Sequence, residues 1–271
     1  MAETKKKKKI VSASTGKEVS GAKKKATVKK QAAPVGNATG LRVGAILLWL
    51  VALAFEVVAV LIFNKTINLT FMPQIAQIII ALVLDLICVI IGSQLWKKAN
   101  HIKPASKKNP FLFWLWNNMG VIVSTLAFVP FVILALTNKE ADKKTKTIAT
   151  VVAVIALAIA GLSSAEWNPI SEEEQQAAMT EIEGDVFWAP SGKVYHMDED
   201  CQAFTQSEEL IVGSVEEAIA AGRTRLCSFC AKRHDVNTEG MLTDDVEVDD
   251  AELEDETEEV EDETVDETTE E

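Results

Sequence analysis

Histidine, cysteine and tyrosine are scarce in this chain, whose 271 residues include three His, four Cys and one Tyr. The sequence also lacks a Gly-rich phosphate-binding loop, a Ser/His/Asp nucleophile set and a His-Glu-x-x-His helix. So few histidines exclude most hydrolase chemistries. The sequence therefore indicates no reaction, and we expect a protein that is not an enzyme.

Each end of the chain nearly lacks charges of one sign. Residues 1–40 contain eleven Lys against Glu3 and Glu18, and residues 241–271 contain eighteen Asp or Glu and no Lys or Arg. Neither end has the apolar periodicity that is needed to bury a core, so we expect a disordered basic arm at 1–40 and a disordered acidic tail at 236–271. The arm could contact an anionic partner, either lipid or nucleic acid, or it could only help to set the topology. Its scattered lysines favour the role in topology. The tail either keeps the protein soluble or binds a partner protein.

Long apolar runs, by contrast, are plentiful. The first begins near Val43, which is too far from the N-terminus for a secretory signal peptide. Four runs have about the 20 residues that a helix needs to cross a bilayer, at 43–63, 75–95, 111–136 and 148–165. They are apolar on all sides and joined by short loops. The fold class expected is mainly α, with a four-helix transmembrane bundle at 41–165.

Lysines in the loops set the expected orientation. The N-terminal arm and the second loop are basic, whereas the first loop holds only Lys65. By the positive-inside rule, both termini then face the cytoplasm of a multi-pass protein in the inner (plasma) membrane. The third loop disagrees, because it also carries four lysines: Lys139, Lys143, Lys144 and Lys146. We expect the stronger bias of the arm to dominate.

Two ionisable residues, Glu56 and Asp85, lie within the apolar runs. Such residues are costly in lipid and are candidates for function. They either form a small ion or proton conduit, or they are protonated and hydrogen-bond between packed helices. The second interpretation is favoured, because four spans without an internal repeat are few for a transporter.

The soluble part begins after the fourth run. Two capping boxes, in which a Ser precedes a Glu by three residues, predict helices that begin after Ser171 and Ser214. The first helix belongs to a polar linker at 166–184. Residues 186–188 and 193–196 are typical of the two strands of a β-hairpin.

A zinc-ligand pattern follows in residues 185–235. Cys227 and Cys230 form a Cys-x-x-Cys pair, and His196 and Cys201 lie upstream of it. A segment this small buries too little apolar surface to be stable alone, so a structural zinc would account for its fold. The soluble part has an odd number of cysteines, which argues for a metal rather than a disulfide framework.

Several alternatives to this ligand set remain. His234 competes with His196 as the fourth ligand, and we favour His196 because it follows a predicted strand close to Cys201. The cysteines would otherwise be reduced thiols in a small domain. A catalytic zinc would need an open position and a general base, for which only Glu199 and Asp200 are near in sequence.

The full pattern is Val-Tyr-His-(x4)-Cys, followed by Ser-x-Glu-Glu-Ala-x-x-x-Gly-(x4)-Cys-x-x-Cys. It resembles a small bacterial Cys/His zinc-binding module, as in Ada-type DNA-repair proteins and in C-terminal extensions of some secreted nucleases. The resemblance covers about 50 of the 271 residues and is carried by Tyr195, His196, Cys201, Ser214, Glu216, Glu217, Ala218, Gly222, Cys227 and Cys230. It implies a recognition or scaffolding unit whose fold is stabilised by a bound metal ion. The chain departs from the commoner form, which has three residues between His and Cys, and from Ada-type modules, which use four Cys.

Together these features predict an adaptor or regulatory membrane protein that displays a structural-zinc module and an acidic tail to the cytoplasm. Its expected partners are the lipid bilayer and a protein that binds the module or the tail; no substrate can be named. The ion conduit on Glu56 and Asp85 is the first alternative. A membrane-tethered nucleic-acid binder is the second, and the acidic tail argues against it electrostatically.

The predicted topology has a direct test. Reporter fusions at residues 40 and 271 should report the same compartment, because four spans return the chain to the side on which it began. Opposite compartments would mean an odd number of spans, and the fourth run would then be the first to re-examine, being the shortest and the one with discordant lysines.

Overall fold

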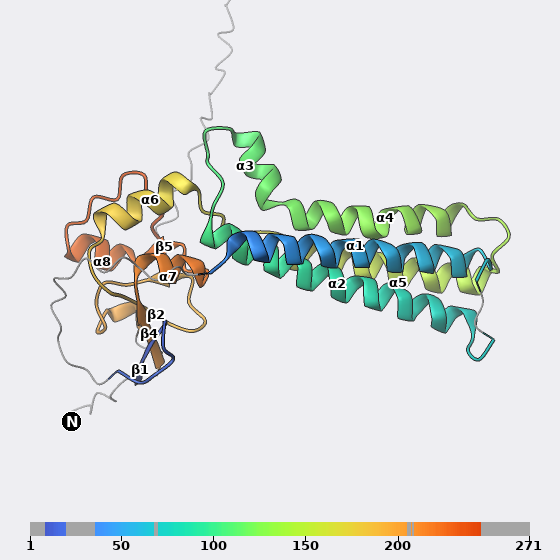
Figure 1. The fold of residues 1–271 in the computed structure, drawn as a ribbon, viewed down its shortest axis with the longest axis horizontal. Helices are drawn as coiled ribbons and strands as arrows, with labels where there is room; N and C mark the ends of the chain where they lie inside the picture. Colours follow the sequence, from blue (N-terminus) through green and yellow to red (C-terminus); the bar gives the residue numbers. More distant parts are fainter. Residues whose placement is uncertain (1–8, 20–35, 68–69, 205–206, 208, 245–271) are drawn as a thin grey trace, which may run out of the picture.

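The computed structural model describes residues 9–19, 36–67, 70–204, 207 and 209–244. The chain is mainly helical, with a long bundle of apolar helices and a small β/α module at one end of it (Figure 1). This confirms the fold class expected from the sequence. The predicted disorder of residues 1–8, 20–35 and 245–271 falls outside the described residues.

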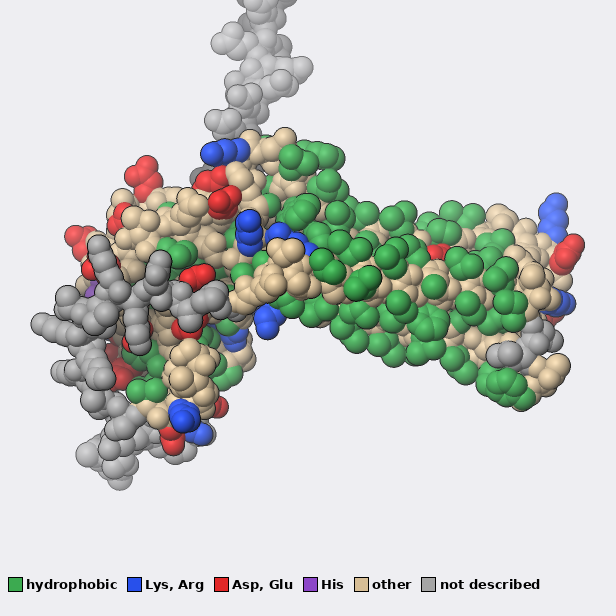
Figure 2. Space-filling view, in the orientation of Figure 1, with side chains coloured by type: hydrophobic (Ala, Val, Ile, Leu, Met, Phe, Trp, Pro, Cys, Tyr) green, Lys and Arg blue, Asp and Glu red, His purple; other side chains and the backbone are tan. Residues whose placement is uncertain are grey.

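Four helices are long and apolar enough to cross a membrane: α1 (Ala38–Phe63), α2 (Gln74–Ile102), α4 (Met119–Thr137) and α5 (Lys143–Ser164). They lie side by side in the bundle, and their outward surface is covered by apolar side chains (Figures 1 and 2). Because they bury only about a third of their most apolar residues inside the protein, most of that surface is suited to lipid. The chain therefore has the structure of a multi-pass membrane protein.

The third predicted span, 111–136, is divided in the structure. Its first residues form a separate helix, α3 (Pro110–Asn117), which turns away from the bundle before α4 begins (Figure 1). At the break, the side-chain amides of Asn117 and Asn118 donate to the carbonyls of Phe113 and Trp114, at 3.0 and 2.9 Å. Short polar side chains that bond to nearby backbone in this way favour helix ends over helix interiors.

The inward faces of the long helices carry small residues at regular spacing. On α5 these are Ala149, Ala153, Ala156 and Ala160, each at most 5% exposed. On α1 the buried alanines recur every seven residues, at Ala45, Ala52 and Ala59. Small side chains let helix backbones approach closely, which is the main source of packing energy between helices in lipid.

The approach is closest between α1 and α2. A Cβ atom added at Gly92 on α2 would lie 2.7 Å from Nε1 of Trp49 on α1, so the two helices require a glycine there. Trp49 in turn contacts Trp96, with ring centroids 5.3 Å apart, and Trp96 contacts Trp116. The guanidinium of Arg42 lies 5.1 Å from the Trp116 ring centroid. This aromatic cluster closes the end of the bundle that carries the module.

The module contains short elements in close succession. In chain order they are α6 (Glu172–Glu181), β2 (Val186–Trp188), β3 (Val194–Tyr195), the 3-10 helix η1 (Gln202–Phe204), β4 (Glu209–Gly213), α7 (Val215–Ala220), β5 (Arg225–Leu226) and α8 (Ser228–Arg233). Both predicted capping boxes are present, at the starts of α6 and α7. Strand β4 was not anticipated from the sequence. The strands form two small sheets, one of β1 (Lys9–Ser12), β4 and β2 in the order β1-β4-β2 and one of β3 with β5.

The predicted linker helix is part of the module and not a polar stalk. Ile170, Ala178 and Ile182 are at most 5% exposed and pack into the same core as Trp188. The polar composition of α6 does not reveal that it packs into the module, because a helix of ten residues needs only one narrow apolar face for such packing. The residues after 235, expected to belong to the tail, also join the module. The amide of Leu226 donates to the carbonyl of Leu242 at 2.8 Å.

The predicted disordered arm contains a strand, so that prediction is wrong for residues 9–19. Strand β1 (Lys9–Ser12) pairs in parallel with β4, from Lys9 opposite Glu209 to Ser12 opposite Val212. Beyond the strand, the amide of Ala13 donates to the carbonyl of Val212 at 2.8 Å. Side chains of β1 provide the reason, since Ile10 packs against the core of the module.

The module rests directly on the end of the bundle. The amide of Glu172, in the first turn of α6, donates to the carbonyl of Ala105 at 3.1 Å. Next to it, the hydroxyl of Ser106 and the amide of Lys107 donate to the Glu173 carboxylate and hold its pKa at about 2. Since both β1 and the rest of the module lie at this end, the start of α1 and the residues after α5 are on the same side of the bundle.

The pairing of β1 with β4 can be tested by hydrogen exchange in the full chain. Ile10→Asp places a charge against the apolar core, so β1 should detach and the amides of residues 209–213 should exchange faster. Thr15→Asp is the matched control, because Thr15 is exposed in the turn after β1. Equal exchange of β4 in both variants would show that β1 does not hold the sheet edge.

Candidate metal centre

Four ligand-bearing side chains meet inside the module. One ligand atom from each of His196, Cys201, Cys227 and Cys230 lies within 4.8 Å of all the others. Each of these residues is at most 2% exposed. The residues that the sequence singled out as metal ligands are thus brought together in one buried cluster.

Two short strands bring the halves of the cluster together. His196 follows β3 and is held in place by paired backbone hydrogen bonds with Phe187 on β2, both 2.7 Å. Cys227 follows β5, and its amide donates to the carbonyl of Tyr195 at 3.0 Å. Because β3 and β5 pair in parallel, the residues that follow them leave the sheet at the same edge.

The two cysteines of the Cys-x-x-Cys pair lie at the start of α8. Cys227 is its N-cap residue, with extended backbone, and Cys230 lies in its first turn. The N-terminal end of a helix favours thiolates because its free backbone N–H groups point towards them. A hydrogen bond from the Cys227 thiol lowers the pKa of Cys230, and the contact with His196 acts in the same direction. The cluster therefore favours at least one thiolate before any metal binds.

The spacing of the ligand atoms suits a tetrahedral metal ion. The Sγ atoms of Cys201 and Cys227 are 3.9 Å apart, and Sγ of Cys230 is 3.9 Å from Nδ1 of His196. With Zn–S bonds of about 2.3 Å, two thiolates on a tetrahedron lie roughly 3.8 Å apart. All four cysteines of the chain are free, so no disulfide competes for these sulfurs. The residues present fit a zinc ion.

A second layer of polar contacts fixes the loop between His196 and Cys201. Asp198, on this loop, accepts a hydrogen bond from Arg233 at 2.8 Å and contacts Nε2 of His234 at 3.0 Å. Both partners lie at the end of α8. The two contacts therefore connect the loop that carries His196 and Cys201 to the helix that carries the Cys-x-x-Cys pair. Sequence reasoning did not find Asp198, because no local pattern marks it.

His234, the alternative fourth ligand, lies outside the cluster. Its ring contacts Asp198 and is not part of the group of atoms that could hold a metal. Glu199 and Asp200, the predicted candidates for a general base, are exposed on the loop, whereas the ligand atoms are buried. A closed set of four protein ligands is typical of a structural metal site, since a catalytic zinc keeps one position open.

The carboxylic acids of the bundle are also buried. Asp85 is 0% exposed and Glu56 is 6% exposed, on the inward faces of α2 and α1. Among the residues that the structure describes, both Oδ atoms of Asp85 and the Oε1 atom of Glu56 have no hydrogen-bond partner. Buried carboxylate oxygens without a partner are expensive in lipid, and a protonated carboxyl group reduces that cost.

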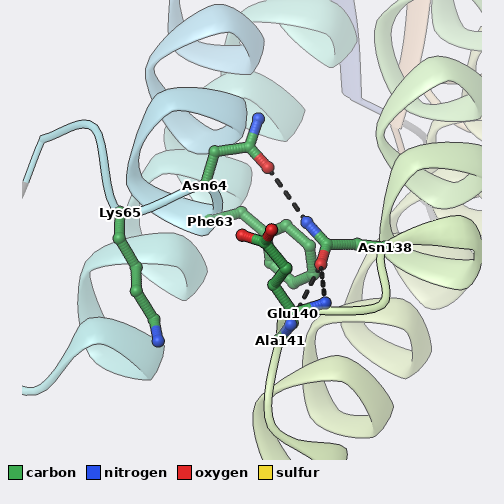
Figure 3. Close-up of a pocket in the computed structure, with 6 residues that line it drawn as sticks. All are labelled: Phe63, Asn64, Lys65, Asn138, Glu140 and Ala141. Atoms are coloured by element: carbon green, nitrogen blue, oxygen red, sulfur yellow. Dashed lines mark hydrogen bonds between the residues drawn. The ribbon is translucent and has the colours of Figure 1, made fainter.

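At the opposite end of the bundle, a hollow of about 150 Å³ lies between the α1–α2 and α4–α5 loops. The side chain of Asn138 bridges the two loops there (Figure 3). The side chain of Asn138 donates to Asn64 at 3.1 Å and accepts from the amides of Glu140 and Ala141. These contacts join the ends of the two loops.

The cluster predicts one zinc per chain, measurable by elemental analysis of the purified full-length protein. Cys227→Ser and Cys230→Ser should abolish both the metal and the fold of the module, because structural zinc contributes binding energy on the order of 10 kcal/mol to folding. Cys88→Ser is the control, since Cys88 lies in α2 outside the cluster.

The histidines are tested in the same way. His196→Ala should lose the metal, and His234→Ala should keep it. A protein that holds no metal, stays folded in strong chelator and shows three freely titrating thiols in the module would contradict the zinc assignment.

Comparison of the chain with models of protein families, with curated proteins and with solved structures finds no match. The buried His/Cys cluster is consistent with a metal-binding module, and these comparisons show no family for it.

Proposed function

We propose that this protein is a membrane-anchored adaptor or regulator that displays a zinc-stapled recognition module at the cytoplasmic face, and that it is not an enzyme. The supporting observation is the closed ligand set, in which His196 and three cysteines are all buried. A metal enclosed in this way stabilises a fold and reaches no substrate. The lysines of the arm and the second loop support the cytoplasmic orientation, against those of the third loop.

The zinc module offers a surface suited to recognition. Phe229 lies between Cys227 and Cys230 of the Cys-x-x-Cys pair and is 49% exposed. It is therefore not used in the small apolar core of the module. Aromatic residues held rigidly on such a surface are frequent anchors at protein interfaces. Residues 245–271 of the acidic tail, which lie outside the described residues, are the other segment that could bind a partner protein.

Cross-linking of the full-length protein in its native membrane tests the adaptor function. A partner of the module should be captured by the wild type and by a chain truncated after residue 244, but not by Phe229→Ala or Cys227→Ser. Met179→Ala is the matched control, because Met179 is exposed on α6 to a similar degree, 46%. Equal capture by metal-free and metal-loaded protein would show that the module is not the recognition unit.

A second function, a small ion or proton conduit, is favoured by one observation. Glu56 and Asp85 are buried on facing helices with oxygens that have no hydrogen-bond partner among the described residues. Liposomes that contain the purified protein would show ion flux that is lost in Glu56→Gln and Asp85→Asn. Flux with this dependence would replace the adaptor proposal, whereas equal leak through wild type and both variants would exclude the conduit.

A further inference from the structure

A cleft lies where the module meets the bundle, separate from the metal cluster. It has a volume of about 580 Å³ and opens between the last turns of α2, the residues after α5 and the C-terminal end of α7. Water occupies about 30 Å³ per molecule, so the cleft has room for a phosphodiester headgroup of a lipid. Figure 2 shows Lys and Arg side chains at this junction, beside the apolar surface of the bundle.

The cleft is rich in positive charge. Lys97, Lys98 and Arg223 line it, against the single carboxylate of Glu166. That carboxylate is 3.5 Å from His101, and the contact lowers the pKa of Glu166 despite its burial. Among the residues that the structure describes, none of the three cations forms an ion pair. The cleft therefore carries an excess of cations over carboxylates.

Two of these cations, Lys97 and Arg223, donate hydrogen bonds to backbone carbonyls. Lys97 donates to the carbonyls of Ser163 and Ala165, at 2.8 and 3.3 Å. Arg223 donates to the carbonyls of Ala189 and Pro190 from the turn between β2 and β3. Carbonyl oxygens position a cation without cancelling its charge, so the attraction for an anion remains.

The depth of the cleft matches that of lipid headgroups. Lys97 lies 23 residues after Gln74, the first residue of α2, which places it about 35 Å along the helix. A hydrocarbon core is about 30 Å thick, so Lys97 and Lys98 lie at the level of the polar headgroups. Exposed Trp167 beyond α5 is typical of the same level.

An apolar track leads from the cleft into the bilayer. Leu84, Ile87 and Ile91 are 39–47% exposed and follow one face of α2 towards Gln94 and Lys98. On the adjacent α5, Ile159 and Leu162 are 47% and 66% exposed. A soluble anion needs no such surface, whereas the acyl chains of a phospholipid do. The combination favours an amphipathic ligand over free phosphate.

We infer that this cleft is a binding site for the headgroup of an anionic phospholipid, whose acyl chains lie along the apolar track between α2 and α5. Lys98 and Arg223 contact the phosphate from the bundle and from the module, so one lipid bridges the two. The site depends on the spans and on the docked module, and it does not depend on the adaptor function.

Native mass spectrometry of the full-length protein tests the site, with phosphatidylglycerol and phosphatidylcholine supplied in equal amounts. Phosphatidylglycerol should be retained preferentially, and Lys98→Gln should weaken its retention about fivefold, the effect of one cation near a lipid surface. Lys139→Gln is the matched control, because it removes one exposed lysine from the opposite end of the bundle. Arg223→Gln should act like Lys98→Gln.

Lys98→Gln is the variant that decides the test, because Lys98 is exposed and its substitution leaves the contacts of the module intact. The zinc content, measured in the same samples, identifies any loss that comes from an unfolded module. Equal retention of the two lipids, or of phosphatidylglycerol by wild type and Lys98→Gln, would overturn the site. Displacement of the lipid by inorganic phosphate at equal concentration would overturn the lipid assignment and indicate a soluble anion.

Discussion

The module depends on the pairing of two strands of only two residues each, β3 and β5. This pairing places His196 and Cys201 opposite Cys227 and Cys230, and the cluster in turn is the centre around which the helices and the larger sheet pack. Two-residue strands are too short to be stable alone. A metal held by four ligands from both halves would supply the missing cross-link, much as it does in other small domains that lack a large core.

Local patterns were sufficient to predict much of the fold. Runs of apolar residues predicted the long helices, and Ser171 and Ser214 predicted the starts of α6 and α7, since a capping box depends on residues three positions apart. The three cysteines of the cluster were predicted from the sequence pattern, and His196 was preferred to His234 because it follows a predicted strand close to Cys201. In the bundle, the seven-residue recurrence of Ala45, Ala52 and Ala59 marks the inward face of α1, although overall hydropathy hides it.

The features that sequence reasoning missed depend on distant partners. Strand β1 is stable only against β4, and α6 is buried only because Trp188 and its neighbours provide a surface for Ala178. The break at Asn118 is local but weak as a signal, because the apolar residues on both sides of it resemble one span. The cationic cleft is likewise assembled from α2, from α7 and from the residues after α5, which no single stretch of sequence displays.

The pairing of β1 with β4 has a consequence for biosynthesis. Their partners Lys9 and Glu209 are separated by 200 residues, among which are all four long helices. At synthesis rates of about 5–20 residues per second, β1 leaves the ribosome roughly 10–40 s before β4 exists. The sheet of the module therefore cannot close until all four long helices have been synthesised, and it closes only if the residues before α1 and those after α5 lie at the same end of the bundle.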